Sequence, residues 1–276
     1  MEKKKTHGIT FLILLILAIL FIYPVFLVVV NSFKGQFYIN DQPFKMPSKE
    51  TFAGLENYIR GIEKTEFISA AFYSVFITVC SVAVIVLFTS MTAWYIVRVS
   101  NKFTKFLYYF FVSAMIVPFQ MVMFTMTKIA NMLYLDNPVG IIFIYLGFGA
   151  GLSVFMFAGF VKAIPYELEE AAMIDGCNPV VTYFKIILPV LRPTAITVGI
   201  LNTMWIWNDY LLPYLVIGSD YKTIPIAIQY LRGGYGSIDM GAMMAMLVLA
   251  IIPIIVFYLV AQKYIIEGVA AGAVKG

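Results

Sequence analysis

The chain has 276 residues, of which 62% are hydrophobic and only 12% are charged, and its formal net charge at pH 7 is +4. A soluble domain carries roughly 25% charged residues. Because a chain of this length cannot hide so many apolar side chains in a water-soluble core, the composition excludes an ordinary soluble protein and indicates an integral membrane protein.

Six apolar stretches are each long enough to cross a hydrocarbon core of about 30 Å, which takes roughly 20 helical residues. Lipid offers no hydrogen-bond partner to the backbone, so these stretches predict an all-α membrane protein with six transmembrane helices. The expected spans, in chain order, are Ile9–Val30, Phe67–Val97, Phe106–Ile129, Val139–Val161, Thr194–Ile217 and Met240–Gln262.

Polar segments join the six spans. One transmembrane domain (9–262) is expected between an N-terminal tail (1–8) and a C-terminal tail (263–276). Its longer connecting segments fall at 31–66, 130–138, 162–192 and 218–239.

The positions of lysine and arginine predict the orientation. With the N-terminus inside, the inner segments and tails hold 11 of the 19 lysines and arginines, and five of the other eight fall in the long segment 31–66. Both termini and segment 162–192 are therefore predicted to be cytoplasmic. The segments 31–66, 130–138 and 218–239 are predicted to be outer loops.

Segment 162–192 carries the most specific pattern. It reads E-A-A at 170–172, then G at 176 and I-I-L-P at 186–189. Ala171 and Ala172 favour a helix and have no bulk, so another protein's surface could come close. The acidic residues beside them suit the first turns of a helix, and Gly176 allows a left-handed residue after it. An ordinary helix–turn–helix with a solvated acidic face is the alternative.

Prolines punctuate this segment and several spans. Pro179 fits the start of a second helix, and Pro189 would kink or end that helix. Pro118, Pro213 and Pro253 can bend the helices that contain them.

The fifth span carries an unusual group of polar and aromatic residues. A carboxylate near a membrane core is costly and usually faces a partner or water. Indoles can stack on sugar rings while amides and carboxylates pair with hydroxyls. We expect a solute route lined by Asn202, Trp205, Asn208 and Asp209, with Tyr145 from the preceding span opposite. The alternative is an aromatic belt at the outer interface.

The sequence offers no catalytic chemistry. It contains no G-x-x-x-x-G-K-[ST] phosphate loop, and its single histidine, His7, lies in the N-terminal tail. Cys80 and Cys177 have no partner at metal-ligand spacing. We therefore expect neither an enzyme nor a cofactor in this chain, no metal site and no nucleic-acid partner.

The pattern in segment 162–192 resembles the EAA loop of ABC-importer permeases, E-A-A-x3-G-x9-I-x-L-P, with every fixed position matched. Pro165, Leu168 and Glu169 resemble the sugar-permease version of that loop. Similar motifs cover nearly the whole chain: Asn31–Lys34, Trp94-Tyr95, Val117-Pro118-x-Gln120, Trp207–Pro213, Thr223–Pro225 and Gln262–Gly276. The chain is identified as a member of the carbohydrate-importer permeases, which include the smaller maltose-type permease and the multiple-sugar and raffinose-type permeases.

The resemblance implies a type I ABC-importer fold in a bacterial-type cell membrane. It implies a second, homologous permease subunit, two ATPase subunits that supply the ATP and Mg chemistry, and an extracytoplasmic binding protein that delivers a sugar. Contact with the ATPase is expected from two groups of residues: Glu169, Glu170, Ala171, Ala172, Asp175 and Gly176 in the EAA loop, and Gly272, Val274, Lys275 and Gly276 in the tail. The loop Gly233-Gly234-Tyr235-Gly236 is expected to meet the binding protein.

Other functions remain open at this point. An ion-coupled secondary transporter would need ionisable residues at the membrane midplane and usually shows internal repeats, whereas only Asp209 is a candidate here and no repeat is clear. An ABC permease for a non-sugar solute, and a membrane scaffold that docks an ATPase without transport, are also compatible with the residues.

Overall fold

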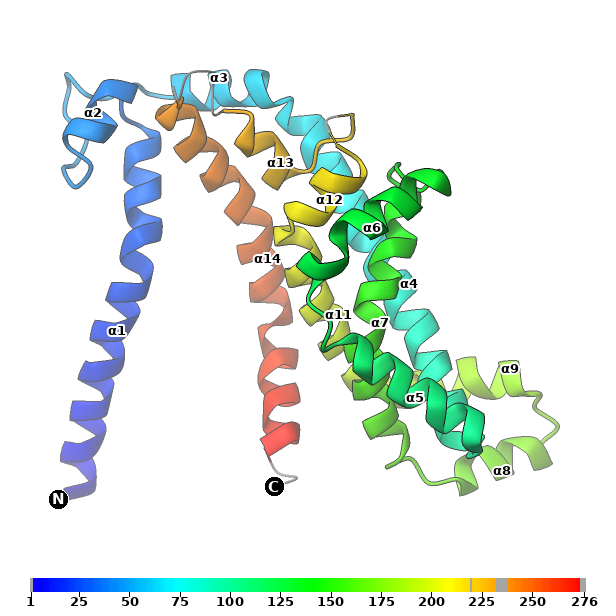
Figure 1. Cartoon of the computed structure of the whole chain (residues 1–276). Coiled ribbons are helices and arrows are strands. Elements are labelled where there is room, and N and C mark those ends of the chain that lie inside the picture. The colour runs from blue at the N-terminus through cyan, green and yellow to red at the C-terminus, as the bar shows by residue number, and fades with distance from the viewer. Residues whose placement is uncertain (1, 219, 232–237, 274–276) are drawn as a thin grey trace. The chain divides into compact units, whose positions relative to one another are not determined.

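The computed structural model describes residues 2–218, 220–231 and 238–273, with side chains from residue 8 to residue 264 of these ranges (Figure 1). In these ranges the chain is mainly helical, with connecting turns and an isolated antiparallel bridge between Lys34 and Phe52. The helices are α1 (Glu2–Ser32), α2 (Gln36–Asp41), α3 (Glu56–Thr65), α4 (Phe67–Arg98), α5 (Lys102–Ala114), α6 (Phe119–Met132), α7 (Gly140–Val161), α8 (Glu167–Ile174), α9 (Pro179–Thr182), the π-helix η1 (Tyr183–Ile187), α10 (Leu188–Val190), α11 (Arg192–Asn208), α12 (Leu211–Val216), α13 (Ile224–Gln229) and α14 (Met240–Ala273).

The chain forms two compact units. The first unit combines Met1–Ala70 with Ile226–Ile255, and the second combines Ala71–Pro225 with Val256–Gly276. Helices α4 and α14 each continue from one unit into the other.

Four helices in the described ranges are long and apolar enough to cross a membrane: residues 8–32 of α1, all of α4 and α7, and residues 240–264 of α14. The count reaches six when two bent pairs are each taken as one span. These pairs are α5 with α6, bent by 107°, and Pro179–Val190 with α11, bent by 75°. The third predicted span, 106–129, is thus not one straight helix, and the fifth, 194–217, ends its first helix at Asn208.

The break in the third predicted span follows from Pro118. Helix α5 ends at Ala114, and Pro118 takes an extended conformation (φ −63°, ψ 136°) as the N-cap of α6. Proline has no N–H to donate to the preceding turn, and its ring crowds the carbonyl four residues back. The expected bend at Pro118 is therefore confirmed, whereas Pro253 lies inside a continuous α14.

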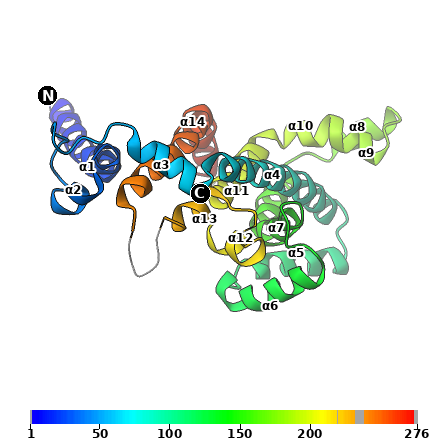
Figure 2. The ribbon, with the colours of Figure 1, turned by 90° about the horizontal axis from the view of Figure 1, so that it is seen from above.

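Helix α7 lies at the centre of the second unit, with α5 and α11 packed against it (Figure 2). A Cβ atom at Gly149 of α7 would come within 2.8 Å of Ile85 Cδ1 and 2.9 Å of Asn202 Oδ1. Glycine therefore allows α4, α7 and α11 to meet closely at this level. The buried core around this point includes Ile77, Ile85, Tyr145, Val154, Phe157, Val161, Tyr183, Ile187, Val198 and Ile206.

The long segment 31–66, expected as an outer loop, is folded in the first unit. Asn57 of α3 is buried and donates from Nδ2 to the backbone oxygens of Ser32 (2.8 Å) and Lys34 (2.7 Å). The Ser32 hydroxyl also hydrogen-bonds the Tyr58 hydroxyl at 2.7 Å. These bonds fasten α3 to the end of α1.

An ionic cluster fixes α3 to the start of α14. Asp239 pairs with Arg60 (2.9 Å) and Lys64 (2.8 Å), and its Oδ1 accepts from the Ala242 N–H at 3.1 Å. Burial alone would raise the pKa of Asp239, but the hydrogen bonds from Lys64, Ala242 and Arg60 outweigh it and hold the pKa below its usual value. Asp239 therefore both caps α14 and joins it to α3.

Asp239→Asn should weaken this junction. The variant keeps the side chain's size and loses the charge that attracts Arg60 and Lys64. We expect it to lose about 1 kcal/mol of unfolding free energy, seen as a lower midpoint of thermal unfolding of the purified protein at pH 7. Glu56→Gln is the matched control, because Glu56 is exposed and also pairs with Arg60. Equal shifts in the two variants would contradict the role of Asp239.

Acid should have the same effect on the unmodified protein. Because the pKa of Asp239 is lower in the folded state, its contribution is fully present above the unfolded value of about 4. The contribution is lost as the pH falls below that value and through the folded pKa. The difference in unfolding midpoint between the unmodified protein and Asp239→Asn should therefore shrink below about pH 4. If the difference in unfolding midpoint stayed constant as the pH fell through the folded pKa of Asp239, the stabilising role of its charge would be contradicted.

Candidate functional site

Segment 162–192, which carries the E-A-A pattern, is named the EAA segment. Its first helix, α8, ends as the sequence predicts. Glu167, Glu169 and Glu170 lie in its first turn, where negative charge is favourable. Gly176 has φ +81°, in the left-handed region. Its N–H donates to Met173 O (3.0 Å), and the Cys177 N–H donates to Ala172 O (2.9 Å). This is a Schellman cap, so the expected left-handed residue at Gly176 is confirmed.

The second half of the segment also follows its prolines. Pro179 is the first residue of α9, and Asn178 caps that helix by accepting from the Val181 N–H at 2.9 Å. The turn then widens into the π-helix η1 just before Pro189. Because Pro189 cannot donate to the carbonyl four residues back, the ordinary hydrogen-bond ladder is interrupted there. The chain bends by 75° between Pro179–Val190 and α11.

Helix α8 has a narrow buried face and a wide exposed one. Only Glu169 (1% exposed) and Ala172 are buried between Glu167 and Gly176. The other expected ATPase-contact residues are exposed: Glu170, Ala171, Asp175 and Gly176. Apolar side chains are exposed beside them, among them Ile174 at 85%. Of the two neighbouring glutamates, which were expected to act alike, Glu169 is thus buried and Glu170 is exposed.

Glu169 is held by α4. Arg98 Nε donates to Glu169 Oε1 at 2.7 Å, and the Trp94 indole N–H donates to Oε2 at 3.1 Å. Arg98 also donates to Ile164 O at 3.0 Å and lies over the Tyr166 ring. The carboxylate is therefore paired and hydrogen-bonded, as a buried charge must be.

A second contact joins the other half of the segment to α4. The Tyr183 hydroxyl hydrogen-bonds Ser90 Oγ at 2.6 Å, and the Tyr183 and Trp94 rings are 5.6 Å apart. Figure 1 shows α8 and α9 together at the end of α4. Arg98 is not among the site residues predicted from the sequence. No local pattern pairs it with Glu169, which lies 71 residues away in the chain.

The structure brings together three members of the polar group expected along a solute route. The Tyr145 hydroxyl donates to Asp209 Oδ2 at 3.2 Å, and the Tyr145 ring meets Trp205 edge-on at 5.4 Å. Asp209 Oδ1 also accepts from the backbone N–H groups of Leu211 (3.1 Å) and Leu212 (3.4 Å). Asp209 therefore links the end of α11 to the start of α12.

The remaining members separate into a buried and an exposed group. Asn202 is 4% exposed and donates to Val198 O (2.8 Å) and Ser153 Oγ (3.3 Å), so it faces α7. Trp205 is 39% exposed, and Asn208 is exposed on the same side of α11. Tyr145 is fully buried behind Trp205. Asn202 and Tyr145 are thus packed between α7 and α11, whereas Trp205 and Asn208 are accessible on the surface of α11.

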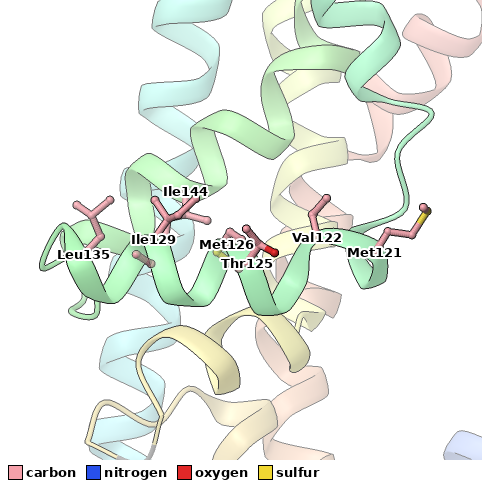
Figure 3. Close-up of a pocket in the computed structure, with 8 residues that line it drawn as sticks. Met121, Val122, Thr125, Met126, Ile129, Leu135 and Ile144 are labelled. Atoms are coloured by element: carbon pink, nitrogen blue, oxygen red, sulfur yellow. The ribbon is translucent and has the colours of Figure 1, made fainter.

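A cavity of about 360 Å³ lies beside α6 (Figure 3). Its lining residues are Met121, Val122, Thr125, Met126, Ile129, Ala130, Leu135 and Ile144. The Thr125 hydroxyl is the one polar side-chain group among them. A sugar needs several hydrogen-bond partners, so the chemistry of this cavity does not fit one.

Other expected site residues lie outside the described ranges. These are Gly233, Gly234, Tyr235 and Gly236 of the outer loop, and Val274, Lys275 and Gly276 of the tail. Gly272 lies in the last turn of α14. In the described part of the chain no group of three or more His, Cys, Asp or Glu side chains could hold a metal ion.

Comparisons with known proteins agree on a family. Residues 85–270 match the model of the binding-protein-dependent transport system inner membrane components. The chain is similar to the probable starch degradation products transport system permease protein AmyC of Thermoanaerobacterium thermosulfurigenes, with 38% identity over 276 residues covering 99% of both chains. It is also similar to the multiple sugar-binding transport system permease protein MsmG of Streptococcus mutans, with 35% identity and 99% of both chains covered.

A solved structure has the same fold. It is a chain of a bacterial ABC transporter involved in the import of the acidic polysaccharide alginate. The TM-score is 0.77 at 22% sequence identity, and the match covers 96% of this chain and 98% of that one.

Gly176→Ala should loosen the EAA segment. A Cβ atom in the left-handed region costs roughly 1–2 kcal/mol, so the Schellman cap should open more often. Purified protein should then be cleaved faster by trypsin after Lys185, read as the cleavage rate on a gel. Gly159→Ala is the control, because a Cβ atom there meets nothing within 4 Å and alanine favours its helix. Equal cleavage rates in the two variants would refute the cap's contribution.

Proposed function

We propose that this chain, which belongs to the family of binding-protein-dependent transport system inner membrane components, is the permease subunit of an ATP-driven sugar importer. The observation that carries the proposal is the full-length similarity to permeases named for starch degradation products and for multiple sugars. The chain is a multi-pass membrane protein and a transport subunit, not an enzyme. We infer an oligosaccharide as solute.

Coupling to ATP hydrolysis is assigned to the exposed side of α8. Glu170, Ala171 and Ile174 lie on this side, away from buried Glu169 and Ala172. Small alanine side chains let a partner surface approach closely, and exposed Ile174 gives it apolar area to bury. A free carboxylate at Glu170 suits a basic group on the partner. This combination fits a groove on a cytoplasmic ATPase, with two ATPase subunits serving two permeases.

The solute route is assigned to the exposed side of α11, enclosed by a second, homologous permease subunit. Leu201, Met204, Trp205 and Asn208 form one exposed stripe at helical spacing. An indole beside an amide suits a sugar, whose ring faces are apolar and whose edge carries hydroxyls. Tyr145 and Asp209 hold Trp205 and the end of α11 in place from behind.

The remaining partners follow from the proposed orientation. With both termini and α8 cytoplasmic, segments 31–66 and 218–239 face an extracytoplasmic sugar-binding protein, and the folded α2 and α3 add a firm surface there. The loop at 233–236 is proposed to meet the binding protein, and the tail at 272–276 to reach the ATPase subunits. ATP and Mg belong to those subunits.

Deleting the chain should abolish uptake. In cells that keep the other transporter genes, deletion of this subunit should stop accumulation of the labelled oligosaccharide that supports growth. A panel of starch-derived and raffinose-type sugars would identify that substrate. Uptake of every sugar at the original rate would end the sugar-importer proposal.

Glu170→Ala should impair coupling and leave the membrane fold intact. The side chain is exposed and makes no packing contribution that would be lost. We expect normal amounts of chain in the membrane but several-fold less ATPase retained on the purified permease and several-fold slower uptake. Glu63→Ala, on the exposed side of α3, is the matched control. ATPase retention equal to that of the control would show that Glu170 does not dock.

Cysteine substitution should map the solute route. In a background without Cys80 and Cys177, cysteines at 205 and 208 should react with a small thiol reagent and become protected by the transported sugar. A cysteine at buried 202 should react slowly with or without sugar. Equal labelling rates at 205 and 208 with and without the sugar would show that these residues do not line the route.

A further inference from the structure

We propose that three residues of α4, Ser90, Trp94 and Arg98, form a clamp on the EAA segment. The clamp holds α8 through Glu169 and η1 through Tyr183, and α4 thereby transmits movement of the ATPase into the membrane. The proposal rests on the proposed function, because it needs an ATPase docked on α8. It assigns positioning roles to five residues that do not themselves face that partner.

The three α4 residues form a row. Ser90, Trp94 and Arg98 are spaced by four along one helix, so they lie on the same face. Arg98 and Trp94 bind the two oxygens of Glu169, at 2.7 Å and 3.1 Å. Ser90 Oγ donates to Val86 O at 2.6 Å, and it hydrogen-bonds the Tyr183 hydroxyl, also at 2.6 Å.

Trp94 is the shared member of the clamp. Its indole N–H meets Glu169 of α8, and its ring lies 5.6 Å from the ring of Tyr183 in η1. The two halves of the EAA segment, separated by the Gly176 turn, therefore meet on one side chain. A push on α8 reaches α4 at the same place as a push on η1.

Helix α8 depends strongly on this contact. Between Glu167 and Gly176 only Glu169 and Ala172 are buried, so Glu169 is the one long side chain by which α8 is held. Removing one partner of a buried ion pair leaves an uncompensated charge. The complete clamp therefore holds α8 in place, and loss of either Glu169 or Arg98 should weaken that attachment.

The far end of α4 is also fastened within the second unit. Ser74 Oγ accepts from the Ile224 N–H at 2.8 Å, and the rings of Tyr73 and Tyr221 meet edge-on at 5.4 Å. Ser74 and Arg98 lie about 36 Å apart at 1.5 Å per helical residue. No break interrupts α4 between them. A continuous helix gripped at both ends moves as a rod.

The test uses the complete importer in proteoliposomes with its binding protein. Glu169→Gln removes the clamp's charge, and Tyr183→Phe removes its hydroxyl while keeping the ring. We expect both variants to assemble with the ATPase but to move several-fold less sugar per ATP hydrolysed. Arg98→Lys, which keeps the charge, should restore part of the ratio relative to Arg98→Gln. Tyr95→Phe is the matched control, because Tyr95 neighbours Trp94 on the exposed side of α4.

The ratio of sugar to ATP separates coupling from folding. A merely structural role would lower transport and ATP hydrolysis together and leave the ratio unchanged, which would overturn the proposal. Should Glu169→Gln fail to assemble, Tyr183→Phe decides on the same ratio. Glu170→Arg tests the docking separately. Lost ATPase association in that variant, together with an unchanged ratio in Tyr183→Phe, would refute the clamp alone, whereas intact association would refute the docking on which it rests.

Discussion

The buried carboxylate of Glu169 is the constraint on which the arrangement of the EAA segment depends. A charge taken out of water needs full compensation, and here Arg98 and Trp94 supply it from α4. That requirement sets the rotation of α8 about its own axis. Once Glu169 points inward, Glu170 and Ala171 must point outward, since successive helical residues are 100° apart. The exposed face that we assign to the ATPase is thus fixed by an interaction on the opposite face.

Helix breaks at prolines set the direction of the chain in two of the apolar segments. A straight helix would carry segment 102–132 across a bilayer in one direction, but Pro118 bends it by 107°. Pro189 and the π-helix before it turn the chain by 75° where the EAA segment gives way to α11. Each break falls where proline removes a donor, so the change of direction is a local property of the sequence. The buried contacts of α7 with α5 and α11 then hold the bent pieces in register.

Local rules therefore predicted more of the structure than long-range ones. The left-handed Gly176, the start of α9 at Pro179 and the bend at Pro118 are confirmed, because each depends on a few neighbouring residues. The family is confirmed as well. The inward turn of Glu169 and the burial of Asn202 were not predicted, because their partners Arg98 and Ser153 lie 71 and 49 residues away. The helices α2 and α3 within the predicted outer loop 31–66 were not predicted either, because their packing depends in part on distant partners, such as Asp239 for Arg60, 179 residues away.

The placement of charge bears on the ion-coupled alternative. Such a transporter needs ionisable groups at the membrane midplane, yet neither the four apolar helices nor the two bent pairs contain an Asp or Glu. Asp209 lies just beyond α11, and its oxygens accept from the Tyr145 hydroxyl and from the N–H groups of Leu211 and Leu212. These three hydrogen bonds connect the end of α11 to α7 and α12. The polar groups of these helices include amides, hydroxyls and indoles, which are the groups that suit the neutral sugar that we propose as solute.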